Sequence, residues 1–140
     1  MGLLKRLFGQ PERHSVRGPS AEHPTAAAAI LRLCEIDAER RGDDQWLTFA
    51  ASGAGRSATI QVSGDKVNFL TLEVPLHELL AAHEPGLVEI VSPGGRRGED
   101  RTLWIVDPPA PAAIARIVHL AFVHACGLGE GYSVEGNRDG

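Results

Sequence analysis

Cysteine and long apolar runs are both scarce in this chain. The two cysteines, Cys34 and Cys126, are too few for the disulfide framework of a small secreted protein. No stretch reaches the ~18 apolar residues that a membrane-spanning helix requires. The N-terminus also lacks an apolar run of signal-peptide length. We therefore expect a cytoplasmic protein whose thiols stay reduced and pack as small hydrophobic groups.

Positive charge is also limited. The formal net charge is −4 and only 5% of the residues are aromatic, whereas a nucleic-acid binder normally carries a basic field or an aromatic stacking platform. Lysine occurs only at Lys5 and Lys66, so arginine supplies most of the positive charge. Together with the abundant alanine, glycine and proline, this indicates a coding bias more than a set of phosphate-binding arginines. The composition argues against a nucleic-acid partner.

What the chain does contain is enough for one folded domain. Its 140 residues are 43% hydrophobic and 23% charged, which is ordinary for a domain with a real core. Residues 1–19 differ from the rest, because four basic residues outnumber a single acidic one and Gly18-Pro19 follows. We predict a flexible basic tail with an apolar tip over residues 1–19, a single domain over 20–136 and a disordered C-terminus over 137–140.

Hydrophobic periodicity predicts three helices and five strands in this domain. The first helix, expected over Thr25–Arg41 with Ser20 as its cap, places Leu33 and Asp37 on one face. The resulting order, α-β-β-β-α-β-β-α, predicts an α+β fold with a mostly antiparallel five-stranded sheet and helices packed on one face. An edge strand over residues 132–135 would follow the last helix. The remaining elements are helices over 76–83 and 111–126 and strands over 46–51, 57–62, 67–72, 87–91 and 102–106.

Three short motifs that could carry chemistry fit structural roles better. Gly53-Ala54-Gly55 matches part of a dinucleotide fingerprint, but a strand follows it where that motif needs a helix, so we expect a hairpin turn. His77 and His83 are too far apart to share one helical face, as a zinc-protease motif requires. His119 and His124 likewise point in different directions. The sequence thus predicts no catalytic residue, no metal site and no cofactor.

Two basic groups remain as candidate contact sites. Arg96 and Arg97 lie at the tip of an expected hairpin, where they could contact an acidic partner. A miniature amphipathic helix at the N-terminus would suit a membrane surface or the groove of a partner protein. It has an apolar face beside two basic residues: Leu3, Leu4, Leu7 and Phe8, with Lys5 and Arg6.

The order of the elements, with Trp46-Leu47-Thr48-Phe49 opening the sheet, resembles the type III secretion chaperone-like superfamily. The resemblance covers about residues 20–136. Members of this superfamily, which includes many bacterial domains, are typically non-enzymatic, often homodimeric, and bind extended segments of other proteins. The resemblance implies that the helix over 76–83 lies near a dimer seam. It also implies that the first helix and the exposed strands offer the binding surface.

The sequence therefore predicts a non-enzymatic protein-binding module, chaperone-like or an adaptor, and leaves two alternatives open. A small-molecule-binding domain or minor enzyme would need polar groups that converge on a pocket between sheet and helices. Asn68, Gln61 and His119 are the candidates for such a pocket. A peripheral membrane protein would instead be tethered by residues 1–9.

Overall fold

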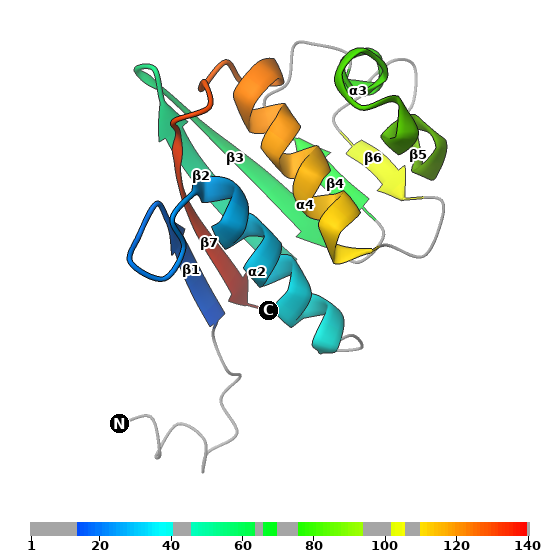
Figure 1. Cartoon of the computed structure of the whole chain (residues 1–140). Helices are drawn as coiled ribbons and strands as arrows, with labels where there is room; N and C mark the ends of the chain where they lie inside the picture. Colours follow the sequence, from blue (N-terminus) through cyan, green and yellow to red (C-terminus); the bar gives the residue numbers. More distant parts are fainter. Residues whose placement is uncertain are drawn as a thin grey trace.

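A computed structural model describes residues 14–40, 46–63, 66–69, 76–93, 102–105 and 110–139 of the chain. The described strands form one antiparallel sheet of seven in the order β1-β7-β2-β3-β4-β6-β5. Helices cover one face of this sheet and leave the opposite face open (Figure 1). The strands are β1 (His14–Gly18), β2 (Trp46–Gly53), β3 (Arg56–Ser63), β4 (Lys66–Phe69), β5 (Val91–Pro93), β6 (Thr102–Ile105) and β7 (Ser133–Asp139).

The helical elements of the described chain follow the predicted periodicity closely. Leu76–His83 forms α3 over the expected residues, and Pro111–Leu120 forms α4, which continues as a π-helical turn, η2 (Ala121–Ala125). Helix α2 spans Ala26–Glu39. Its cap is Thr25 and not Ser20, because the Thr25 hydroxyl accepts a hydrogen bond from the Ala28 amide while the Ser20 hydroxyl donates to the Arg17 carbonyl.

The α+β class and the antiparallel sheet are as predicted, but the expected five strands and element order are wrong. The sheet gains β1, and the edge strand expected over 132–135 is the longer β7, Ser133–Asp139. Residues Pro85–Ile90, expected to be largely strand, form a 3-10 helix, η1, and only Val91–Pro93 joins the sheet. Apolar content alone could not separate these two outcomes, since short apolar runs suit either structure.

The expected domain boundaries also differ from the structure. Residues 14–18, placed in the flexible tail, form β1, which pairs with β7 from His14↔Arg138 to Gly18↔Val134. Residues 137–139, expected to be disordered, belong to β7. The predicted edge strand over 132–135 is instead interior, because β7 pairs with β2 on its other side. Residues 1–13 lie outside the described part of the chain.

The turn between β2 and β3 is a two-residue hairpin. Ala54 and Gly55 have φ angles of 52° and 75°, the left-handed values that a tight hairpin with right-handed strand twist requires. Gly53 therefore ends a strand and Arg56 begins one, so the hairpin interpretation of this glycine-rich motif is correct.

The core lies between the sheet and helices α2 and α4. Leu33, Phe49 and Ile117 are fully buried there. Arg138 is a charged residue buried beside this apolar core, with only 2% of its surface exposed. Its guanidinium donates to Asp37 over 2.9 Å and to the Arg40 carbonyl over 3.1 Å. The ion pair ties the last described strand to the C-terminal end of the first helix.

Gly18 of β1 lies tightly against the start of α2, and a substitution there tests this packing. A Cβ atom at Gly18 would lie 2.5 Å from the Thr25 carbonyl oxygen and 2.9 Å from the Ala29 Cβ. Gly18→Ala should lower the free energy of unfolding by about 1–3 kcal/mol, because neither the backbone nor a buried alanine can yield freely. Gly131→Ala, where a Cβ meets no atom within 4 Å, is the control in chemical denaturation. Equal stability of the two variants would contradict this packing.

The Arg138–Asp37 pair gives a second prediction. Arg138→Met leaves the Asp37 carboxylate mostly buried without its counter-charge, and should cost about 3 kcal/mol of unfolding free energy. Adding Asp37→Asn should recover part of that loss, because the buried charge is then gone. Arg17→Met breaks an exposed arginine–carboxylate pair with Glu135 and should cost less than about 1 kcal/mol. Similar losses for Arg138→Met and Arg17→Met would show that Arg138 is not a structural tie.

Candidate functional site

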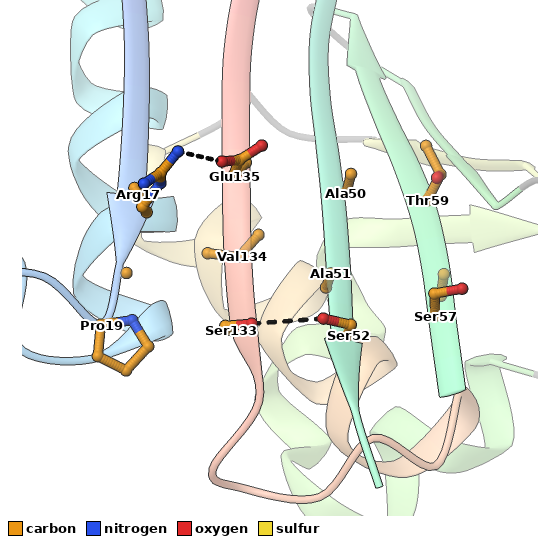
Figure 2. Close-up of a pocket in the computed structure, with 12 residues that line it drawn as sticks. Arg17, Pro19, Ala50, Ala51, Ser52, Ser57, Thr59, Ser133, Val134 and Glu135 are labelled. Atoms are coloured by element: carbon orange, nitrogen blue, oxygen red, sulfur yellow. Dashed lines mark hydrogen bonds and ion pairs between the residues drawn. The ribbon is translucent and has the colours of Figure 1, made fainter. Parts of the chain in front are cut away.

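The open face of the sheet carries small polar side chains in rows across strands β1, β7, β2 and β3. One row places Arg17, Glu135, Ala50 and Thr59 side by side, since these residues are register partners in successive strands. The next row is made of hydroxyls, Ser133, Ser52 and Ser57. Figure 2 views this face with the helices behind the sheet. Strands distant in sequence thus meet to form one surface.

These rows surround a depression of about 670 Å³. The apolar side chains on the open face of this depression are those of Ala50 and Pro19, because Ala58 and Val134 alternate with the open-face residues and pack toward the core. Hydroxyl groups line the same depression from three strands: Ser52, Ser57, Thr59 and Ser133. The hollow exists because the side chains that would otherwise fill the sheet surface are small, and the site combines apolar contact with hydrogen-bonding groups.

Polar contacts across the strands hold the rim in place. The Arg17 guanidinium donates to the Glu135 carboxylate, and both side chains are mostly exposed. The hydroxyls of Ser52 and Ser133 lie 3.4 Å apart (Figure 2). The Arg17–Glu135 pair contributes at most about 1 kcal/mol to stability because solvent screens it. It leaves the lining of the depression without net charge.

The lining groups of this depression offer hydrogen bonding and a small apolar surface. A serine nucleophile needs a base within hydrogen-bond reach, and the described contact of the Ser52 hydroxyl is with another hydroxyl, that of Ser133. Arg17 and Glu135, the charged lining residues, pair with each other. The geometry supports binding through hydroxyls and a small apolar surface, and does not assemble a nucleophile–base pair from these lining groups.

A second cluster of polar groups lies on the helical side of the sheet. The His119 Nδ1 atom lies 2.8 Å from the Tyr132 hydroxyl, which satisfies the polar atom of a tyrosine that is 1% exposed. Burial, and then the nearby Arg116, lower the pKa of His119, although Glu130 and Glu84 oppose the shift. Burial raises the pKa of the Tyr132 hydroxyl above its usual range, so Tyr132 stays neutral.

The other histidine of α4–η2 has a different environment. His124 stacks on His83 of α3, with ring centroids 3.8 Å apart and an interplanar angle of 13°. His119 and His124 therefore point in different directions, as their spacing predicted. Within the part of the chain that the structure describes, no three histidine, cysteine or acidic residues converge in a way that could hold a metal ion.

The cysteines are separate from both sites. Cys34 is buried in α2, and burial, with Asp37 and Glu35 nearby, raises its pKa to about 12. Burial also raises the pKa of Cys126, which is partly exposed. Both thiols are free and protonated at neutral pH.

Among the described helices, none has the length and apolar character needed to cross a bilayer.

Several residues singled out in the sequence fall outside what the structure describes. This applies to Arg96 and Arg97 and to the whole N-terminal group, Leu3, Leu4, Lys5, Arg6, Leu7 and Phe8. The three polar residues proposed for a pocket between sheet and helices do not form one. Gln61 lies on the open face in register with Thr48, His119 bonds Tyr132 on the helical side, and of Asn68 only the backbone is described.

The depression itself was not predicted from the sequence. Its signal was present in the alternation of β2 and β3, where Ala50 and Ser52, and Ser57 and Thr59, occupy every second position. Such alternation indicates a solvent-exposed face, and only the pairing of β1 and β7 beside these strands makes the face hollow.

The comparisons with known proteins assign no family to this chain, since it matches no protein-family profile, no curated protein and no solved structure.

The lowered pKa of His119 predicts a pH dependence of stability. Because the folded state prefers neutral His119, its contribution is fully present above the ordinary histidine pKa of 6.5 and declines as the pH falls toward the lowered value. Wild type should therefore lose more thermal stability between pH 7.5 and pH 5 than His119→Gln loses. His23→Gln, which also removes one imidazole, serves as the control. A His119→Gln variant as acid-sensitive as wild type would contradict the assignment.

Proposed function

We propose that this protein is a non-enzymatic protein-binding module that binds an extended segment of another protein in the depression on the open face of its sheet. The observation that carries the proposal is the hollow itself. In the described part of the chain, the helices lie on one face of the seven-stranded sheet (Figure 1), and small side chains of β7, β2 and β3 leave a depression on the other face.

The shape of the depression favours a polypeptide over a small molecule. Small-molecule sites enclose most of their ligand, typically about 70–90% of its surface. The depression instead is partly open to solvent, so a compact ligand would keep one side in water. A longer segment can gain affinity by extending along the face beyond the hollow.

The lining chemistry favours a partner with an apolar side chain and free backbone polar groups. The surface of Ala50 and Pro19 can accept a small apolar side chain, and the hydroxyls of Ser52, Ser57 and Ser133 can bond to the amides and carbonyls of an extended backbone. Because Arg17 and Glu135 balance each other, a strongly charged segment would gain little. We propose an uncharged extended segment as the ligand.

This proposal keeps the chaperone-like resemblance as an expectation about partners. In that superfamily the exposed strands contribute to binding of extended segments, and here the depression is built from such strands. Homodimerisation near α3, a cytoplasmic location and weak membrane contact by residues 1–9 are parts of the same proposal. The enzyme alternative has less support, because its pocket was expected between sheet and helices and the depression lies on the opposite face.

The decisive experiment is selection of peptides from a displayed random library on the purified full-length protein. Selected peptides should be uncharged, carry one apolar anchor, and lose at least tenfold in affinity on Ala50→Trp, which fills the depression from an exposed position. Glu35→Trp, on the exposed side of α2, is the control and should bind as wild type. Circular dichroism establishes that both variants fold.

Two results would reject the proposed function. Peptides that bind Ala50→Trp as tightly as wild type would place the binding surface elsewhere. Failure of any sequence to be enriched over several rounds would mean that the protein does not bind extended segments with useful affinity.

A further inference from the structure

The open face of the sheet continues beyond the depression along β2. Burial alternates along this strand, which places Trp46 and Thr48 on the same open face as Ala50. Among the described residues, Trp46 is the large hydrophobic side chain that remains exposed, to 37%. Because Trp46 and Ala50 are four residues apart on one strand, they lie about 14 Å apart along the face. The face therefore offers a second apolar contact in line with the depression.

A row of polar side chains separates these two apolar contacts. Thr48 lies in register between Asn137 of β7 and Gln61 of β3, and all three are half-buried. The Asn137 Oδ1 atom accepts a hydrogen bond from the Ser15 hydroxyl over 2.7 Å. The Asn137 amide nitrogen and the Thr48 hydroxyl have no hydrogen-bond partner among the residues that the structure describes. This row can therefore bond a polar side chain that lies over it.

The spacing of the three features fits an extended polypeptide that runs along the strands. Successive side chains on one side of an extended chain are about 6.8 Å apart. Ala50, Thr48 and Trp46 follow one another at the same spacing, because they are alternate residues of one strand. Neighbouring strands are instead about 4.8 Å apart, so a segment that crosses them would not place its side chains over successive strands. The match favours a segment aligned with β2.

The charges of the face favour an uncharged segment along this whole length. Arg17 and Glu135 pair with each other at the depression, and the side chains of the Thr48 row carry no charge. At the far end, the Trp46 indole offers an aromatic ring on which a flat apolar group can pack. Each position of the segment thus meets a different surface: small and apolar, then polar, then aromatic.

We propose that the extended segment bound by this protein carries a bulky apolar residue, aromatic or proline, four positions from its small apolar anchor, and that Trp46 recognises this residue. The small anchor lies over Ala50. The residue midway between the two has a hydroxyl or amide side chain that bonds Thr48 and Asn137. This inference rests on the proposed function, since it gives the sequence pattern of the segment bound there.

Selection of displayed random peptides on the full-length protein and on Trp46→Ser tests the pattern. Peptides selected on wild type should combine the small anchor with an aromatic residue or proline four positions away, in either direction. Peptides selected on Trp46→Ser should keep the anchor and lose the second preference. A wild-type peptide should bind Trp46→Ser about tenfold more weakly, as expected for a lost aromatic contact. Glu35→Ser, exposed on α2, is the control, and circular dichroism establishes that both variants fold.

Moving the bulky residue of such a peptide by one position gives a sharper test. An odd spacing turns that side chain to the other side of an extended segment. The shifted peptide should therefore lose about tenfold in affinity for wild type and nothing further on Trp46→Ser. In Trp104→Phe, which leaves Trp46 as the one tryptophan of the chain, the original peptide should move the emission to shorter wavelength and the shifted peptide should not.

The alternative results separate this inference from the proposed function. Peptides that lose affinity on Ala50→Trp but bind Trp46→Ser as tightly as wild type would overturn the role of Trp46 and leave the proposed function standing. Equal affinity of the original and shifted peptides for wild type would overturn the four-residue spacing. Failure to select any peptide would overturn both the pattern and the proposed function.

Discussion

Strand β7 is the constraint on which the rest of the structure depends. It is the last of the described strands in sequence, yet it lies between β1 and β2, so this half of the sheet is complete only when residues 14–18 and 133–139 have met. Its sequence, Ser133–Asp139, contains one large apolar residue and is a poor strand former by itself. Pairing on both sides holds it in place, and Arg138 reaches from its inner face to Asp37. The ion pair therefore connects the end of the chain to the first helix.

The same strand separates the two faces of the molecule. On the inner side, Gly136 allows α2 to approach closely, since a Cβ there would lie 2.9 Å from Leu33 Cδ2 and from Phe49 Cδ1. On the outer side, the neighbouring Glu135 and Ser133 border the depression (Figure 2). Helix packing and the candidate binding surface thus rest on alternate residues of one strand. A shift of register by one residue would exchange them and destroy both.

The sequence predicted the elements that are specified locally and missed those that are specified by tertiary pairing. Helix α3 and the Ala54-Gly55 hairpin follow from apolar spacing and turn chemistry within a few residues. Strand β1 was missed, and β7 was expected only as a short edge strand over 132–135, because these polar and glycine-containing segments become full strands by pairing with each other and with β2. The depression was missed for the same reason. Its serines come from strands far apart in sequence, and each alone indicates an ordinary solvated position. The buried ion pair left one signal in the sequence. Asp37 falls on the apolar face of its helix, where an acidic residue needs a buried partner such as Arg138.

Helix α3 and the depression belong to separate parts of the fold. The main contacts of α3 are with η1, η2, α4 and β5, whereas the depression is lined from β1, β7, β2, β3 and the adjoining Pro19. The His119–Tyr132 pair on the helical side and the rim of the depression come nearest in sequence at Tyr132 and Ser133. Tyr132 bonds His119, and Ser133 lies against Ser52. Between η2 and this point, Gly127 and Gly129 have positive φ angles that suit glycine. Because β7 is paired on both sides, strand pairing and not the helical layer sets the positions of Ser133 and Glu135 at the rim.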